Sequence, residues 1–566
     1  MKIFTLIKPL ILLILIVELA DAENKDDGIR YLNGVLRLNI IDAKTKLLVP
    51  ARIEVLGANG KSYFARDAVP IGGACAEMGE NGALGPIVYD GLSLEDALAK
   101  FTKTIKDPYS EAEHFYSNGE SLLTLPPGLF KIKVFKGPEY ELGYIEVNIV
   151  AGETVNKSIE LSRFVNMPAK GWYSADDHLH IARITNAVDP LVIMQMQAED
   201  IHVGNLLQMG WSATFSGTQQ YAHGHKSQYQ EGDHLIISGQ ENLRTHLLGH
   251  TITLGASEPI HNPEKYLLYR LAWQHAVDQG ALNGYAHFGA NKRDLGPDPG
   301  LPVLAPHNLM HFMEVLQFNQ GRYGTWYDML NLGFRITPTA GSDYPCSAPN
   351  LPGRERFYTK IQGPFTYKNW LEGVRAGRTF VTTGPMLEFS INGQDIGDEI
   401  SLHKAGEVAV KGRVLYSADH YGVKGLELLE NGRVVYRSPR LDDSGEISFE
   451  IRHKIKETSW LALRTSGALN IYPSKRKNYT AHSAPIYITL EDSPPISQHL
   501  RASSIAKDWL ASLHSLEERI SKENIKYLQA AKSAGGPIPP HVLSDSRLAL
   551  MEEIDHAKKF FQGLIQ

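Results

Sequence analysis

The chain has 566 residues, which at roughly 150 residues per domain predicts about three to four domains. Hydrophobic residues make up 43% and charged residues 21%, which excludes a largely disordered chain. The net charge of -6 leaves no basic footprint for nucleic acid, and two cysteines exclude a disulfide scaffold or a cysteine-based zinc ribbon. The 22 histidines are concentrated, with 13 of them between Gly171 and His311.

Residues 1–22 have the pattern of a secretory signal peptide. Lys2 and Lys8 give a positive start, and Leu10–Val17 is an apolar run too short to cross a bilayer of about 30 Å. Ala20-Asp21-Ala22 then offers a small-x-small cleavage site. The alternative is an uncleaved membrane anchor. We expect a secreted or periplasmic protein, cleaved after Ala22, with no membrane span once the signal is removed.

Residues 30–166 are expected to form an N-terminal β-sandwich. Val35–Ile40 and Ala51–Val55 alternate apolar and polar residues with a period of two, as half-buried strands do. The same alternation returns in Val408–Leu415, which predicts a C-terminal β-sandwich over residues 386–492.

A helical tail is expected over residues 497–562. Trp509, Leu513, Leu516 and Ile520 are spaced as one apolar stripe on a helix. Core packing is the main interpretation of the stripe, and a partner-binding helix that supports oligomerisation is the alternative.

Residues 170–385 have a different rhythm, which favours a central α/β domain. A helix is expected from Asn262 to Gln279, followed by the strand Ala281–Ala286, which ends at His287. The plan repeats with helix Trp326–Leu332, a following strand, and Gly341-Ser342-Asp343. This succession is typical of an α/β barrel, in which chemistry lies at the C-terminal ends of the strands.

Asp176-Asp177-His178-Leu179-His180 is the strongest local motif. On a strand, residues i and i+2 face the same side, so the imidazoles of His178 and His180 can converge on one cation. Asp176 could orient one of these histidines by contacting it on the side away from the cation. The alternative interpretation is two incidental histidines on a solvent-facing strand.

Other polar residues at predicted strand ends extend this motif. They are Glu241, His250, His287 and Asp343, with Glu314 as a weaker candidate. Nitrogen and carboxylate ligands without thiolates suit Zn²⁺ first, with Mn²⁺ or Fe as alternatives. The sequence therefore predicts one or two divalent metal ions.

These motifs together resemble the PHP superfamily (polymerase and histidinol phosphatase), closest to its exported carbaryl-hydrolase branch, the CehA/McbA-type metallohydrolases. The residues that carry the resemblance are Gly171–His180, Glu241, His250, His287, Gly341-Ser342-Asp343, Gly373–Leu387 and Ile391-Asn392-Gly393. The similarity covers roughly Gly171 to Leu490. It implies a multidomain α/β plus β protein, with a PHP-like distorted β/α barrel between two β-sandwiches.

Two departures from the family pattern affect the expected metal content. Pro345 stands where the family has a histidine after Gly-Ser-Asp, and Val203–Leu207 replaces its Thr-Asp-His segment. Both changes remove ligands from a trinuclear site, so one or two metals are expected, and a degenerate site is the alternative.

The remaining candidates have weaker support. His223 and His225 form a second His-x-His motif in a polar loop, where metal or substrate contact competes with solvation. Cys346 follows Asp343 closely and is expected to line the pocket; whether it pairs with Cys75 is left open. Arg378 is a candidate anchor for an anionic substrate, with a salt bridge as the alternative.

The resulting hypothesis is a hydrolase of a small-molecule ester, carbamate or amide. The metal would lower the pKa of a bound water from near 16 towards about 7. Asp343 would act as the last ligand or the general base, with Glu241 as the second catalytic candidate. A PHP-type phosphoesterase and an inactive exported carbohydrate- or protein-binding protein are the alternatives.

Overall fold

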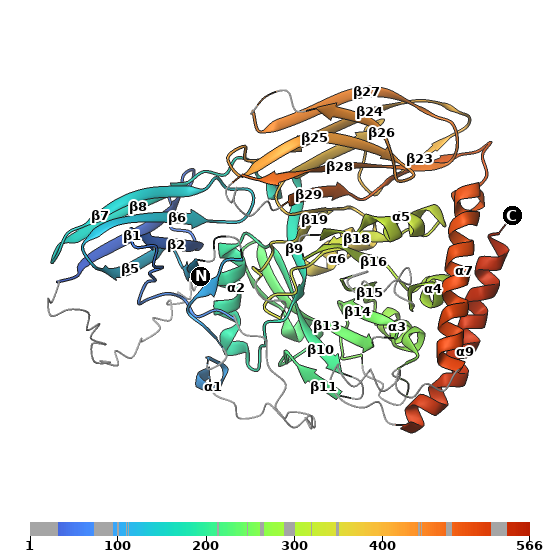
Figure 1. Ribbon diagram of the computed structural model, residues 1–566, viewed down its shortest axis with the longest axis horizontal. Coiled ribbons are helices and arrows are strands. Elements are labelled where there is room, and N and C mark those ends of the chain that lie inside the picture. The colour runs from blue at the N-terminus through green and yellow to red at the C-terminus, as the bar shows by residue number, and fades with distance from the viewer. Residues whose placement is uncertain are drawn as a thin grey trace, which may run out of the picture.

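The computed structural model, shown in Figure 1, describes most of the chain. It describes residues 32–72, 94–98, 101–108, 110, 112–211, 214–245, 247–260, 265, 267–287, 300–318, 320–346, 350–439, 442, 444–470, 478–521 and 540–565. The expected signal peptide, Cys75 and the expected helix start at Asn262 lie outside the described residues.

Two sheets form the N-terminal β-sandwich, at the blue end of the chain in Figure 1. One sheet has the order β5-β1-β8 and the other β3-β4-β2-β6-β7. Leu36, Ile53, Phe115 and Ile132 are fully buried between them, as the period-two alternation predicts. The elements are β1 (Gly34–Asp42), β2 (Ala51–Gly57), α1 (Leu94–Leu98), β3 (Ile105–Lys106), β4 (Glu113–Ser117), β5 (Glu120–Leu125), β6 (Gly128–Phe135), β7 (Gly143–Ile149) and β8 (Thr154–Leu161).

The central domain is a mixed sheet with helices packed against it. Its strands are β9 (Trp172–Leu179), β10 (Val203–Trp211), β11 (Thr214–Gly217), β12 (Tyr229–Glu231), β13 (His234–Thr245), β14 (Gly249–Leu254), β15 (Leu282–Tyr285), β16 (Phe312–Gln317), β17 (Gln320–Gly321), β18 (Thr337–Ala340), β19 (Arg356–Lys360) and β20 (Thr379–Thr382). Its helices are α2 (Asp189–Ala198), α3 (Tyr269–Asp278), α4 (Gly300–Leu304), α5 (Tyr323–Asn331) and α6 (Tyr367–Arg375). Of the helix expected over residues 262–279, the structure describes α3, Tyr269–Asp278.

Parallel pairing in this sheet joins β9 to β10, β10 to β13, β15 to β16, and β16 to β18. Antiparallel pairing joins β13 to β14, β14 to β15, and β19 to both β9 and β20. The end of β9 meets the loop after β18 at one bridge, between Leu179 and Tyr344, beside which the His180 amide donates to the Tyr344 carbonyl at 2.6 Å. This bridge brings the end of β9 next to the loop that follows β18.

The C-terminal β-rich domain also has two sheets. One contains β22-β21-β24-β27, and the other extends the central sheet through antiparallel pairing of β20 with β29. The hydrogen-bonded strands thus run across the expected boundary at residue 386. The strands are β21 (Met386–Ile391), β22 (Gln394–Asp395), β23 (Glu399–Leu402), β24 (Gly406–Leu415), β25 (Tyr421–Glu430), β26 (Arg433–Pro439), β27 (Glu446–Ile455), β28 (Ser459–Leu469), β29 (Asn478–Ser483) and β30 (Ile486–Leu490).

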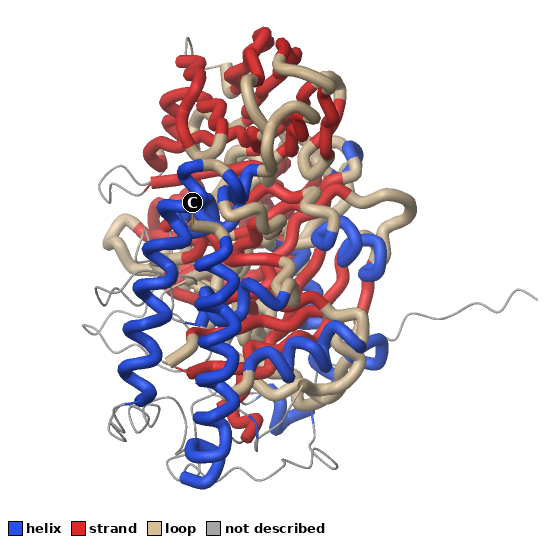
Figure 2. The backbone as a smooth tube through the Cα atoms, turned by 90° about the vertical axis from the view of Figure 1, so that its right-hand side faces the viewer, coloured by secondary structure: helices blue, strands red, loops and turns tan. Residues whose placement is uncertain are grey.

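The tail forms two long helices, α7 (Leu500–Ser521) and α9 (Pro540–Gly563), which lie side by side in Figure 2. The stripe Trp509, Leu513, Leu516 and Ile520 is buried in the core that also contains the central domain. Core packing within the chain therefore accounts for the stripe. None of the helices in the described part of the chain combines the length and apolar character needed to cross a bilayer.

Candidate metal centre

His178 and His180 lie at the C-terminal end of β9 and share one face of the strand. Both side chains are buried, and their Nε2 atoms are 3.0 Å apart. The period of two brings both rings to this face, where the central strands surround them. Two ring nitrogens this close need a cation or a proton between them, because two lone pairs repel.

The other nitrogen of each ring has a partner that orients it. His178 Nδ1 lies 3.0 and 3.1 Å from the two carboxylate oxygens of Glu314 on β16. His180 Nδ1 lies 3.2 Å from the Leu207 carbonyl, which can only accept, so His180 carries its proton on Nδ1. The Nε2 lone pair of His180 therefore points into the centre, as in metal-ligating histidines.

Glu241 on β13 is the acid at the middle of the group. Its Oε2 lies 3.3 Å from His180 Nε2, and its Oε1 lies 3.2 Å from His287 Nε2 and 2.9 Å from His250 Nδ1. Burial alone would raise the pKa of Glu241, but the charge of Arg244 and hydrogen bonds from the histidines lower it well below its usual value. Glu241 is therefore a carboxylate able to bridge two positions.

Asp343 closes the group from the loop after β18. Its Oδ1 lies 3.2 Å from His180 Nε2 and 3.5 Å from His178 Nε2. Asp343 has a φ of 57° and His287 a φ of 28°. Residues other than glycine rarely adopt this backbone conformation, and those that do are often found at functional sites.

Two overlapping ligand sets result, both of which contain His178. One is His178, Glu241 and His287, and the other is His178, His180 and Asp343; in each, the ligand atoms lie within 4.8 Å of one another. The group therefore has space for one or two cations.

The carboxylates also set the charge of the site. Burial would lower the pKa of His178, but Glu314, Asp343 and Glu241 raise it well above its usual value. The surrounding acids thus favour positive charge at this point, which a proton or a divalent cation can supply. The side chains of His250, His287 and Asp343 are 16%, 16% and 15% exposed, so these three form the open edge of the buried site.

Asp176 has a different place from its neighbours in the motif. Its two oxygens accept from the backbone amides of His178, Ser342 and Gly353 and from the Ser342 hydroxyl. Burial raises its pKa to about 6, although these hydrogen bonds oppose the shift. Asp176 therefore ties the end of β9 to the loop that carries Asp343 and acts on the ligands through the backbone.

The weaker candidates lie outside this group. His223 Nε2 lies 3.0 Å from Gln208 Oε1, and His225 is exposed. Cys346 is disulfide-bonded, and the chain's other cysteine lies outside the described residues. Arg378 lies 3.9 Å from Asp398 as an ion pair.

Arg244 is a site residue that the sequence analysis did not identify. Its Nε lies 3.0 Å from Glu241 Oε2. The spacing of three residues from Glu241 was the available signal, but on a strand this spacing predicts opposite faces. A register shift in the β13–β14 pairing between Glu241 and Arg244 breaks that rule.

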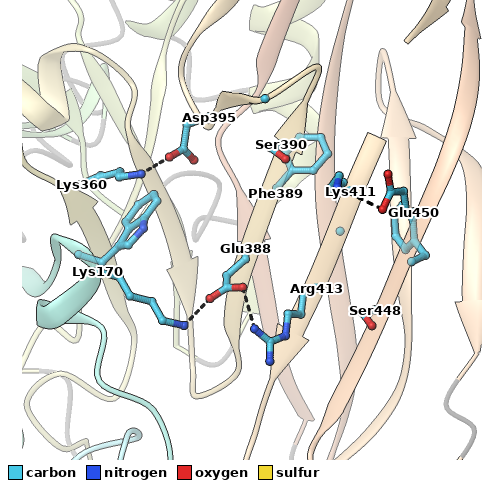
Figure 3. A pocket seen from close by; sticks show the side chains of 14 residues that line it. Lys170, Lys360, Glu388, Phe389, Ser390, Asp395, Lys411, Arg413, Ser448 and Glu450 are labelled. Atoms are coloured by element: carbon cyan, nitrogen blue, oxygen red, sulfur yellow. Dashed lines mark hydrogen bonds and ion pairs between the residues drawn. The ribbon is translucent and has the colours of Figure 1, made fainter. Parts of the chain in front are cut away.

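A separate hollow of about 730 Å³ lies beside β21, β24 and β27 (Figure 3). Its lining cations have carboxylate partners: Arg413 lies 3.2 Å from Glu388, and Lys411 lies 3.2 Å from Glu450. Lys360 pairs with Asp395 and Lys170 with Glu388. Each cation that lines this hollow is thus already paired with a carboxylate.

Comparison with known proteins gives no family assignment. No family model and no curated protein matches the chain. One solved structure is similar over part of it, the crystal structure of GBS52, the minor pilin of Streptococcus agalactiae. The match has 16% identity and a TM-score of 0.15, and it covers 24% of this chain and 47% of the pilin chain.

Proposed function

We propose that the central domain is a PHP-like distorted β/α barrel that hydrolyses an ester, carbamate or amide bond of a small molecule with one or two divalent metal ions. The convergence of His178, His180, Glu241 and Asp343 is the observation that carries the proposal. These residues end β9, lie on β13 and follow β18, which is where barrels place their chemistry.

The donor set fits a divalent cation. Imidazole nitrogens and carboxylate oxygens without thiolates suit Zn²⁺ first and Mn²⁺ or Fe as alternatives. When bound, such an ion lowers the pKa of a coordinated water towards neutrality and polarises a substrate oxygen. Glu314 and the Leu207 carbonyl hold the two imidazoles so that their Nε2 atoms face the ion position.

Asp343 is the best-placed proton acceptor. Its side chain is 15% exposed, and it lies at the open edge of the group beside both histidines of β9. Burial would raise its pKa, but the charges of His178 and His180 and a hydrogen bond from His180 lower it, so the side chain is held as a carboxylate.

A phosphoesterase is the second candidate, and Arg244 favours it. Its guanidinium lies beside Glu241, where a cation can stabilise the charge of a phosphoryl group. Arg378, the cation expected from the sequence to anchor an anion, lies beside Asp398, with 3.9 Å between the charged groups.

A substrate panel separates these candidates. Purified protein is assayed with p-nitrophenyl acetate, a naphthyl carbamate and p-nitrophenyl phosphate, before and after chelation and zinc return. Ester or carbamate turnover that is lost with the metal supports the hydrolase, and phosphate turnover supports the phosphoesterase. Metal-free protein without turnover would contradict both the hydrolase and the phosphoesterase and would support an exported binding protein.

We also propose that the protein is exported. The disulfide at Cys346 supports this, because disulfides persist in oxidising compartments. N-terminal sequencing of protein recovered outside the cytoplasm is expected to begin at Glu23, directly after the small-x-small site.

A further inference from the structure

A second cluster of ligand-type side chains lies at the opposite end of the same strands. Asp200, His202 and His234 offer ligand atoms that lie within 4.8 Å of one another. His202 directly precedes β10 and His234 begins β13, and pairing of Val203 with Leu235 sets the two histidines side by side. At roughly 3.3 Å per residue, β13 separates this cluster from Glu241 by about 23 Å.

The hydrogen bonds of Ser174 determine the tautomer of His202. The Ser174 hydroxyl donates its one proton to the Asp200 carbonyl at 2.6 Å, since a carbonyl cannot donate. Ser174 Oγ must therefore accept from His202 Nδ1–H, 2.9 Å away. His202 Nε2 is left with a lone pair, in a side chain that is 1% exposed and with no hydrogen-bond partner among the described residues.

His234 is oriented in the same way by Asp233. Its Nδ1 lies 2.8 Å from Asp233 Oδ1, a carboxylate that accepts, so His234 Nε2 also carries a lone pair. That Nε2 is buried, with no hydrogen-bond partner in the described part of the chain. The two rings stack with centroids 4.7 Å apart and 18° between their planes.

Asp200 supplies the third acceptor. Its Oδ1 accepts from Arg163 Nη2 at 2.8 Å, whereas its Oδ2 is buried with no hydrogen-bond donor among the residues described. Asp200 is 1% exposed and lies beside the Arg163 guanidinium, which stabilises its carboxylate form.

Three buried acceptors without donors are unusual, because more than about 90% of buried polar groups in proteins have partners. One water molecule has two protons and can satisfy two of the three, so a further acceptor would remain unpaired. A cation satisfies all three at once. Asp233 is 52% exposed, and its Oδ2 lies 3.7 Å from His202 Nε2, so it can offer a fourth ligand.

We propose that Asp200, His202 and His234 form a second divalent-cation site, which prefers Zn²⁺ and stabilises the structure. Two imidazoles and a carboxylate, with Asp233 or water in the fourth position, match a tetrahedral zinc site. The site would join three segments: the turn after α2, the start of β10 and the start of β13. It would also support the N-terminal domain, because Arg163 links Asp200 to Glu139 at 2.6 Å.

The test counts metal in full-length protein. His234→Gln and Asp233→Asn are compared with wild type and with the control His403→Gln, whose side chain is 91% exposed. After dialysis against limiting Zn²⁺, we expect His234→Gln to bind about one zinc less per chain than wild type. Its ester hydrolysis should stay within about twofold, because His234 lies at the far end of β13. Asp233→Asn changes a half-exposed side chain and should bind this zinc more weakly.

The same comparison in a His178→Ala background separates this site from the proposed catalytic one. If zinc binding falls again when His234→Gln is added, the second site is real whatever the fate of the first. Equal zinc content in wild type, His234→Gln and Asp233→Asn would overturn the proposal. In the His178→Ala background, Zn²⁺ should also raise the unfolding midpoint of the chelated protein less when Asp233→Asn is added.

Discussion

The two ends of strand β13 carry histidine clusters with the same donor chemistry and different surroundings. At the C-terminal end, Glu241 lies among four histidines, and Asp343 and His287 give the group an open edge. At the N-terminal end, His202 is 1% exposed, His234 is 13% exposed and Asp233 is 52% exposed. The first group offers two overlapping ligand sets and the second offers one, so the two clusters differ in the number of ligand sets and not in exposure.

The N-terminal sandwich contains a third histidine cluster, around His114, in which each hydrogen-bond acceptor has a donor. His114 Nε2 lies 3.1 Å from Glu54 Oε2, and Lys133 lies 2.9 Å from the other oxygen of Glu54. Arg52 contacts the remaining ring nitrogen of His114 at 2.5 Å. Each polar atom of this cluster has a protein partner, so no acceptor is left for a cation.

The largest effect should come from His178→Ala, because this residue belongs to both ligand sets. Loss of a shared ligand should lower metal content and hydrolysis together, the latter by more than about 100-fold. Metal analysis and ester turnover of the same preparation check this, with circular dichroism as the test of folding. Full metal content with full activity would remove His178 from the centre.

Glu314→Gln should have a smaller effect, since Glu314 acts through His178. The amide keeps the shape but loses the charge that faces His178 Nδ1, and loss of such an orienting partner costs about 10–100-fold in metal affinity or activity. Zinc affinity measured against a chromophoric chelator reports it, and the exposed Glu407→Gln serves as the control. Unchanged affinity would show that His178 needs no orienting acid.

The Glu54 cluster should respond to pH and not to chelators. Burial would raise the pKa of Glu54, but His114 and Lys133 lower it to about 2 from an ordinary 4.5. A depressed carboxyl pKa stabilises the fold above pH 4.5, and this stabilisation is lost as the pH falls from 4.5 to 2. It amounts to about 3 kcal/mol at most.

Urea unfolding of wild type and Glu54→Gln across this pH window checks the size and sign. The variant should be less stable at neutral pH and should show a flatter profile below pH 4.5. A chelator-dependent difference between the two proteins would contradict the contrast with the other clusters.

The smallest effect is expected from His225→Gln. His225 is exposed and outside the ligand sets, so stability should stay within about 0.5 kcal/mol and metal content should not change. Loss of metal in this variant would show that the second His-x-His motif contributes to metal binding.

The sequence could predict the parts of the site that depend on local geometry. The His-x-His spacing predicts one shared face, and the strand ends predict the positions of His287 and Asp343, which the structure brings together around Glu241. The sequence did not predict that Asp176 acts through the backbone, because its hydrogen-bond partners Ser342 and Gly353 are distant in the sequence.

The second cluster was also missed, for a similar reason. His202 and His234 meet only through the register of β10 against β13, which no local pattern specifies.

Anomalous X-ray scattering at the zinc edge, from crystals grown with limiting Zn²⁺, tests the central claim most directly. The account predicts an anomalous peak bounded by His178, His180, Glu241 and Asp343. Crystals of catalytically competent protein with no peak at that position would contradict it.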